Sequence, residues 1–518
     1  MPHRFEDDPI VPFPTVPSSS GEWVPPPITP KQRVATKLIA EAMDAGAKRH
    51  GMTRKQFLRT AAATTTAFMV LNKLNGRDSW GDNAILPVKK EHCDDLDAAR
   101  ELLDTKEFIV DVQTHHIDLM PPVNLPPNII RAIVTAFCNS LRFVNTSDLK
   151  CPEVTGRMNF IKEIFLDSQT TMVVISGLPE QLQFPDFSVP AGVPLTPSSM
   201  AATRELVNQL AGSTRCLTQA MIDPKTPAGS PTSTDSLEHQ VRDLGAKAIK
   251  CYTYNGSWRL DDEDVAYPIW ESAKRLGIGL INVHKGLPLK AFGVNKAEDV
   301  RTLDFPKVVR DFPQMKFCAY HSAYFSAGDH PLGLDAGYHP ANEPVNRGRW
   351  GNIEFLQQIA KIPKHLRKNV YSEIGSTFAI LSASDPDLTQ AAHFIGQLLK
   401  ALGPHNILWG TDCIWWGSPQ FLIDRFKRLQ IPADMQEKYG YPPLTPKVKK
   451  LILGLNAARL YGIKKRARKF LCTIPADALA HAQQAKGGFR SGSSLRVYGA
   501  RTRREFFSMF GQSLREHA

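Results

Sequence analysis

The chain has 518 residues, 42% of them hydrophobic, and a formal net charge of +12. This length and apolar content fit a globular protein with a substantial core, either one large α/β domain with extensions or two to three ordinary domains. The basic charge lies at the ends, since residues 1–80 carry +4 and residues 463–518 carry +9, which leaves −1 for the body. We therefore expect no nucleic-acid partner for the body and a solvated basic extension over 464–518.

Cysteine usage and hydropathy exclude two further classes of protein. The 8 cysteines show no paired spacing and no CxxC motif, so we expect neither a disulfide framework nor a structural zinc site. No stretch reaches the roughly 18 consecutive apolar residues that a membrane-spanning helix needs, so we expect no transmembrane span.

Residues 1–80 form a separate amino-terminal region in our interpretation. The first thirty residues are rich in proline and should be disordered, and a helix is expected over 31–48. Residues 52–59 (MTRKQFLR) precede an Ala/Thr-rich apolar stretch. Together these segments resemble a twin-arginine export signal, with Arg54-Lys55 in place of the arginine pair; an ordinary amphipathic helix is the alternative. Localisation stays open between export and the cytoplasm.

The body, residues 81–463, alternates short apolar strands with amphipathic helices. One helix is expected over 261–276, before Gly277, and another after Asp385, ending before Gly403. Eight such strands suit a (β/α)₈ TIM barrel, an α/β fold. A doubly wound open sheet is the competitor, but the sequence lacks the Gly-rich phosphate loop that such a sheet carries after its first strand. The predicted strands are 108–113, 171–176, 216–222, 247–252, 278–283, 316–320, 369–374 and 406–410.

Metal-ligand residues follow four of these strands. His115 follows the first strand, His284 the fifth, His321 the sixth and Asp412 the eighth. Because the carboxyl ends of parallel barrel strands share one face, we expect a convergent site there. Imidazole nitrogens and a carboxylate are the ligands of a catalytic divalent metal. The long connections 117–170 and 322–350 follow strand ends on the same face and could form a lid.

The order of these motifs resembles the amidohydrolase superfamily, in particular the branch of aminocarboxymuconate-semialdehyde decarboxylase and related metal-dependent hydrolases. The resemblance covers residues 108–463 and includes a closing segment around Asn456. In the first-strand motif, Gln113 occupies the place of the family's first histidine. The first-strand motif is Val110–His115, and the other matching motifs are Val283-His284, Ala319–His321 and Leu408–Asp412.

The resemblance implies roles for these residues. His115, His284 and Asp412 would hold a divalent metal, with Gln113 as a fourth neighbour. Asp412 and His321 would be the catalytic pair that handles water and protons. Residues two apart on a strand share a face, so Gln113 and His115 should point together. His116 should point away, into packing.

Other residues at strand ends have open roles. Some relatives carry a metal-bridging modified lysine where Lys250 stands, but we expect Lys250 to act beside the ligands or on the substrate. Glu373 could accept hydrogen bonds from the site. Five aromatic residues could line a pocket or simply pack; they are Tyr252, Tyr254, Trp258, Trp415 and Trp416.

The favoured function is metal-dependent hydrolysis of a C–N or C–O bond in a small organic substrate, with zinc as the preferred cofactor and manganese as the alternative. A non-oxidative decarboxylase on the same fold is the second hypothesis. A guanidinium that holds a substrate carboxylate, from Arg142 or Arg157, would favour it. An inactive barrel that lost catalysis with the first-strand histidine is the third. A homo-oligomer stays open.

Overall fold

The computed structural model describes part of the chain, and the chain divides into two compact units, Met1–Glu107 and Phe108–Ala518. The expected boundary between residues 80 and 81 therefore moves to Glu107. The expected basic extension, 464–518, lies outside the described residues. The described residues are 11–13, 27–79, 84–103, 107–117, 155–178, 183–184, 187–188, 195–288, 297–325, 352–384 and 387–463.

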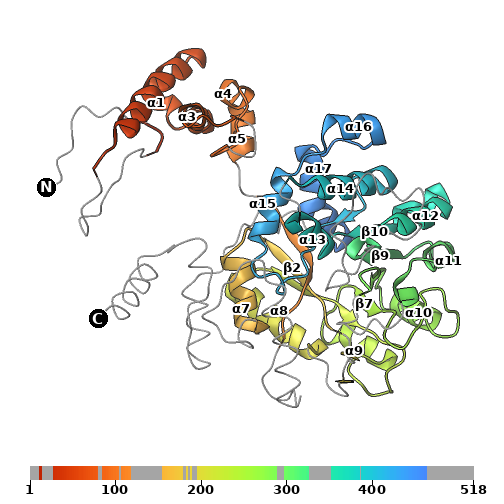
Figure 1. Ribbon diagram of the computed structural model, residues 1–518. Coiled ribbons are helices and arrows are strands. Elements are labelled where there is room, and N and C mark those ends of the chain that lie inside the picture. Colours follow the sequence, from red (N-terminus) through yellow and green to blue (C-terminus); the bar gives the residue numbers. More distant parts are fainter. Residues whose placement is uncertain are drawn as a thin grey trace. The chain divides into compact units, whose positions relative to one another are not determined.

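The amino-terminal unit is helical (Figure 1). Its first helix begins at a capping box, in which Thr29 and Gln32 satisfy each other's backbone donors, with proline at the first helical position. This helix confirms the expectation for 31–48. Residues 1–10 and 14–26 lie outside the described residues. The helices are α1 Pro30–Arg49, α2 Arg54–Phe57, α3 Ala61–Leu74, α4 Glu91–Asp94 and α5 Leu96–Leu103.

A small apolar core explains why this unit folds and why it extends past residue 80. Phe57 is fully buried in it, together with Ile39 and Met43 of α1. The Thr65 hydroxyl donates to the carbonyl of His92, which ties α3 to α4. Within the export-like motif, Arg54 pairs with Asp44 at 2.8 Å, so the motif is part of a folded unit here.

The second unit is built on eight parallel strand segments, as predicted. Each predicted strand appears, although the third is divided at Gln219 into β5 and β6. Neighbouring strands pair in parallel in chain order. A two-stranded antiparallel ribbon, β3 Gln183–Phe184 with β4 Phe187–Ser188, lies apart from them in a separate sheet. The barrel strands are β1 Val110–Thr114, β2 Met172–Ile175, β5 Cys216–Thr218, β6 Ala220–Met221, β7 Ile249–Tyr252, β8 Leu280–His284, β9 Lys316–Tyr320, β10 Val370–Glu373 and β11 Ile407–Leu408.

Backbone hydrogen bonds close this sheet into a barrel. The amide of Val112 donates to the carbonyl of Trp409 at 3.1 Å, and the amide of Asp412 donates to the carbonyl of Gln113 at 2.9 Å. These bonds join the first strand to the chain that continues from the last. At the divided strand, the amide of Gln219 bonds to β2 and that of Ala220 bonds to the residue before β7. The fold is therefore a (β/α)₈ barrel, and the open-sheet alternative is excluded.

Side chains fill the barrel interior, as the fold requires. The strands alternate, so that Leu280 lies in the interior cluster while Ile281 and Val283 pack outward against helices. The closing segment approaches β1 so tightly that a Cβ at Gly454 would lie 2.0 Å from the carbonyl oxygen of Phe108. The interior cluster includes Val110, Val112, Met172, Val174, Leu217, Ala248, Leu280, Cys318, Tyr320, Tyr371 and Leu408.

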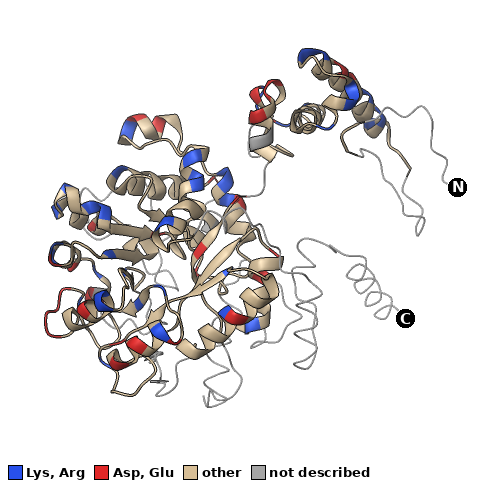
Figure 2. Cartoon of the chain, turned by 180° about the vertical axis from the view of Figure 1, so that it is seen from behind, with Lys and Arg blue, Asp and Glu red and all other residues tan. Residues whose placement is uncertain are grey.

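Helices surround the strands, and charged residues of both signs are interspersed over them (Figure 2). The two predicted helices appear as α10, which begins at Tyr267 rather than at residue 261, and α14, and each is followed by the expected glycine. The helices of this unit are α7 Arg157–Ile161, α8 Pro197–Ala211, α9 Leu237–Arg242, α10 Tyr267–Arg275, α11 Phe305–Asp311, α12 Ile353–Lys361, α13 Thr377–Ser384, α14 Thr389–Leu402, α15 Gln420–Arg428, α16 Ala433–Tyr439, α17 Pro446–Lys450 and α18 Asn456–Leu460.

The predicted lid falls largely on residues 118–154 and 326–351, which lie outside the described residues. Among the residues that are described, no helix is long and apolar enough to cross a membrane.

Candidate active site

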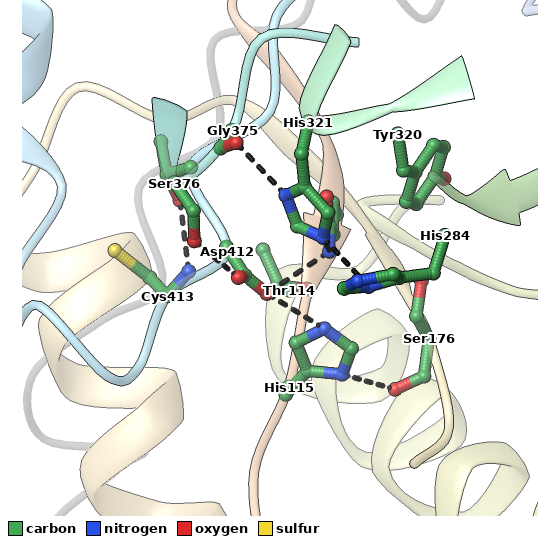
Figure 3. A network of polar contacts seen from close by, with 12 residues as sticks. Thr114, His115, Ser176, His284, Tyr320, His321, Gly375, Ser376, Asp412 and Cys413 are labelled. Carbon is green, nitrogen blue, oxygen red and sulfur yellow. Dashed lines mark hydrogen bonds and ion pairs between the residues drawn. The ribbon is translucent and has the colours of Figure 1, made fainter. Parts of the chain in front are cut away.

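The predicted site residues come together at the carboxyl ends of the strands. Figure 3 shows His115, His284, His321 and Asp412 turned toward one another. Gln113 joins them, because its Nε2 lies 3.0 Å from Asp412 Oδ1 and 3.5 Å from His321 Nε2. The structure thus gathers all five residues singled out from the sequence, while their chemical roles stay predictions.

An irregularity in β1 helps to orient its two residues. Between Asp111 and Thr114 the first strand advances three residues, while β2 advances two, from Val173 to Ile175. Such bulges bend a strand and redirect its side chains, and they are common beside active sites. Asp111 supports the bend, since its carboxylate accepts from the amides of Gln113 and Thr411.

His115 has a hydrogen-bonding pattern that suits a cation partner. Its Nδ1 lies 2.7 Å from the carbonyl oxygen of Ser176, which can only accept, so Nδ1 carries the proton. Its Nε2 lies 2.9 Å from Asp412 Oδ1. In a neutral ring these two atoms would both be acceptors, so either a second proton or a shared cation must lie between them.

Asp412 is held as a carboxylate in a conformation that few residues adopt. Its φ is +60°, the left-handed region. Burial alone would raise its pKa, but the hydrogen bond and charge of His115, followed by the charge of His321 and the hydroxyl of Ser376, hold the pKa below its usual value. Ser376 donates to Oδ2, which leaves Oδ1 to face His115 and Gln113.

His321 begins a run of three residues with positive φ: His321 at +60°, Ser322 at +53° and Ala323 at +49°. Such conformations cost about 1–3 kcal/mol each and persist where the surroundings fix them. Here Glu373 accepts from the amide of His321 at 3.0 Å. The carbonyl oxygen of Gly375 lies 3.0 Å from His321 Nδ1. The imidazole is therefore fixed at the site by strands β9 and β10.

Glu373 is the anchor for two neighbouring turns. It also accepts from the amide of Gly375, and burial raises its pKa to about 8. A Cβ at Gly410 would lie 2.0 Å from Glu373 Oε1, and one at Gly375 would lie 2.4 Å from it. Both glycines are therefore needed for the carboxylate to fit beneath the site, in agreement with its expected acceptor role.

The two histidines from β8 and β9 are directly hydrogen-bonded, with His321 Nε2 3.1 Å from His284 Nδ1. Because His321 Nδ1 carries a proton toward Gly375, His321 Nε2 accepts and His284 Nδ1 donates. His284 Nε2 is then a lone pair, buried and without a hydrogen-bond partner among the described residues. Burial, the His321 ring and the charge of Lys250 lower the pKa of His284 well below its usual value, so the ring is neutral.

The donor atoms fit a divalent cation in type. Two buried acceptors, His284 Nε2 and Gln113 Oε1, have no partner within the described part of the chain, and His115 Nε2 faces Asp412 Oδ1. Two imidazoles, a carboxylate and an amide oxygen are a plausible catalytic set. However, within that part no group of three or more His, Cys, Asp and Glu side chains is already in metal-binding geometry. A cation bound at this position would have to replace hydrogen bonds within the cluster.

Several candidates lie elsewhere. His116 lies 2.9 Å from the Thr203 hydroxyl, so it faces away from the site as expected. Arg157 donates to Thr203 and Ser199 on α8 rather than into the site, and Arg142 lies outside the described residues. Trp258 packs near Trp270 in the outer core, so it does not line a pocket.

Aromatic rings flank the site on two sides. Trp415 stacks on His115 with ring centroids 5.7 Å apart. Tyr254 meets His284 edge-on at 5.2 Å, and Tyr252 lies 5.7 Å from the same ring. Sequence reasoning missed the Ser376 hydroxyl and the Ser176 carbonyl, because a hydroxyl or a backbone carbonyl that bonds a site residue has no spacing signal of its own.

Fold and site together define a barrel enzyme with a histidine and carboxylate site at its strand ends. Residues 214–463 match the model of the amidohydrolase family. This match confirms the resemblance to that family seen in the sequence. No curated protein matches the chain.

Solved structures similar to this chain are distant. An uncharacterized TIM-barrel protein from Bordetella bronchiseptica is 15% identical, covers 70% of this chain and 99% of its own, and has a TM-score of 0.43. 4-Oxalomesaconate hydratase from Rhodopseudomonas palustris is 17% identical over 73% of this chain and 99% of its own, with a TM-score of 0.37. A 5-carboxyvanillate decarboxylase from Novosphingobium aromaticivorans, solved with bound manganese, is 12% identical over 69% and 97%, with a TM-score of 0.37.

Proposed function

We propose that the protein is a metal-dependent hydrolase that cleaves a C–N or C–O bond of a small organic molecule. The observation that supports this proposal most is the convergence of His115, His284 and Asp412 with His321. Three of these residues offer donor atoms, and the fourth is a buried base. The proposal extends the family assignment to a reaction type.

His115 Nε2, His284 Nε2 and Asp412 Oδ1 would hold the cation, with Gln113 Oε1 beside them. Zinc is the preferred ion for two imidazoles, and the amide oxygen makes manganese the alternative. Bound there, a divalent cation supplies Lewis acidity that polarises a carbonyl and makes water more acidic. Ser176 and Ser376 orient the ligands from behind, since each bonds the atom of its ligand that faces away.

His321 would serve as the general base. Burial lowers the pKa of this imidazole to about 4, although the charge of Asp412 opposes that shift. The ring is therefore neutral at pH 7 and can accept a proton at Nε2, while Gly375 keeps its Nδ1 proton in place. The proton taken from water is then returned to the leaving nitrogen or oxygen.

Non-oxidative decarboxylation on the same site is the second candidate. The guanidinium that would have favoured it is not supplied by Arg157, which is engaged on α8. One cation does act on the site: the charge of Lys250 influences both His284 and His321. A buried positive charge favours a substrate that carries a carboxylate, which either reaction can use.

Elemental analysis of purified wild type and of Asp412→Ala, combined with activity assays, tests the proposal. We expect near-stoichiometric zinc or manganese in wild type and loss of metal in the variant. Wild type should hydrolyse members of a panel of small lactones and amides without releasing carbon dioxide from aromatic acids. Carbon dioxide release would instead select the decarboxylase. Metal-free protein in both forms, with no turnover, would leave only the inactive barrel.

A further inference from the structure

Lys250 on β7 is a buried amine whose surroundings do not satisfy it. The residue is fully buried, and its Nζ has no hydrogen-bond partner among the described residues. Its neighbours are two aromatic faces, with Nζ 4.4 Å from the ring centroid of Tyr252 and 4.1 Å from that of Tyr320. Ring faces attract a cation but accept none of its three N–H donors in the usual way.

Strand register places this amine directly under the site. Lys250 of β7 pairs with Asn282 of β8. Two residues further along these strands, in the layer of side chains above, Tyr252 pairs with His284, which in turn pairs with Tyr320 of β9. The lysine side chain extends upward from its layer, because Nζ reaches the rings of Tyr252 and Tyr320. The ammonium therefore lies at the level of His284, on the floor of the predicted metal site.

A second buried lysine shows how this protein treats an ammonium with a purely structural role. Lys285 is equally buried, but its Nζ forms an ion pair with Asp304 at 2.8 Å. Pairing of this kind is the rule for buried charges. Lys250 departs from it, and burial lowers the pKa of its amine to about 8, so most of it is still charged at pH 7. A buried charge with open donors beside a catalytic site marks a binding function.

We propose that Lys250 binds the carboxylate of the substrate, which is therefore a small planar organic acid. The reason to expect a carboxylate on the substrate is the ammonium of Lys250 on the barrel floor. The reason to expect a planar substrate is the rings that flank the site, Trp415 beside His115 and Tyr254 beside His284. This inference rests on the proposed enzymatic function of the same site. It names the substrate class without choosing between hydrolysis and decarboxylation.

Ligand titration without turnover tests the inference. Benzoate, isophthalate and the neutral isostere benzamide are titrated into full-length wild type, Lys250→Met and Lys285→Met by calorimetry. Methionine matches the length of lysine and removes only the charged head. We expect wild type to bind the carboxylates and Lys250→Met to bind them at least about tenfold more weakly, which corresponds to about 1.4 kcal/mol. Benzamide should bind the two proteins equally.

The matched control separates a specific role from a general effect of buried charge. Lys285→Met leaves Asp304 unpaired, so it should lower thermal stability but keep carboxylate affinity. Lys250→Met should keep or raise thermal stability, because an unpaired buried charge is removed. A structural role for Lys250 predicts a lower melting temperature.

Three results would overturn the inference. The first is equal carboxylate affinity in wild type and Lys250→Met. The second, which needs no variant, is wild type that binds benzamide as tightly as benzoate. The third is wild type that binds neither carboxylate. Because none of these titrations measures turnover, the inference can fail while metal content and hydrolysis still support the proposed function, and the reverse also holds.

Discussion

The two units of this chain use backbone conformation and polar groups in different ways. In the described part of the amino-terminal unit, only Gly51 and Gly76 have positive φ. Its polar side chains serve as helix caps, as Thr29 and Thr53 do in two capping boxes. In this unit, the backbone conformations that the local sequence favours are also the ones that the packing requires.

The barrel unit contains every described non-glycine residue with positive φ. Of these eight residues, His321, Ser322, Ser376 and Asp412 belong to the site or support it. The same region holds buried acceptors and an ammonium without hydrogen-bond partners among the described residues, Gln113 Oε1, His284 Nε2 and Lys250 Nζ. Four of the eight strained residues thus lie at or beside the site, where a ligand can also meet the three unmet hydrogen bonds named here.

Removing the carboxylate of Asp412 should have the largest effect and would test this comparison directly. Asparagine has nearly the same shape as aspartate and tolerates positive φ, so Asp412→Asn should fold. We expect a loss of activity on the order of 10⁴-fold, the scale for groups that act as a unit, together with loss of metal. Metal content, activity and melting temperature are measured on the same samples. Full activity in this variant would show that the strained turn has no catalytic purpose.

His321→Ala should come next, because it removes the proposed base and leaves the proposed ligands. We expect a loss of about 10²–10⁴-fold in turnover with metal retained. His116→Ala is the matched control: that ring bonds Thr203 on the outer side of the barrel, so it should cost stability rather than turnover. If His321→Ala loses metal while His284→Ala keeps it, the roles of the two strands are reversed.

The barrel was predictable because its strands have a clear hydrophobic periodicity and because the site residues directly follow strands in the sequence. All eight strands were located, and His284, His321 and Asp412 were found because parallel strands end on one face. The supporting partners were not predictable. Ser376 and the carbonyl of Gly375 come from a turn after β10, and no spacing rule links them to Asp412 and His321.

The amino-terminal unit was predicted less well for a different reason. Prolines and an export-like motif near Arg54 suggested an arm, and the first helix was the only element expected with definite bounds. The core around Phe57 depends on contacts between α1 and α3 and on the α4–α5 segment. Such contacts lie far apart in the sequence and leave little periodic signal in short helices.

Phe57→Ala should damage the amino-terminal unit alone. Phe57 is fully buried, and a Phe→Ala change at such a site typically costs about 3–5 kcal/mol. We expect faster proteolysis and hydrogen exchange over residues 30–103, with unchanged turnover by the barrel. Lys55→Ala, an exposed neighbour, is the control and should do neither. A parallel loss of barrel activity would mean that the two units are functionally coupled.

Gln113→His tests the proposed role of residue 113 beside the metal. A glutamine oxygen is a weak donor for zinc, whereas an imidazole restores the family's ligand pattern. We expect zinc to bind about 10–100-fold more tightly, the range by which groups around a metal change its affinity. Manganese should gain less. Calorimetric titration of both apo proteins with each ion measures the effect. Equal zinc affinity would mean that Gln113 does not face the metal.

The smallest effect concerns the pH dependence of stability at Glu373. Burial raises the pKa of this carboxyl from 4.5 to about 8, so between these values the folded protein holds a proton that the unfolded chain releases. Stability from this group is complete below about pH 4.5 and is lost as pH rises toward 8. Glu373→Gln should therefore reduce the fall in melting temperature between pH 5 and pH 8.

The slope, rather than the absolute midpoint, is the informative quantity for Glu373. A glutamine oxygen can accept from only one of the two backbone donors that the carboxylate serves, the amides of His321 and Gly375. The variant is thus expected to be less stable at every pH, but with a flatter profile. Glu205→Gln, at an exposed position, should leave the slope unchanged. Parallel profiles for wild type and Glu373→Gln would mean that these amides keep the carboxylate ionised throughout, and that the site's anchor is a charge rather than a proton.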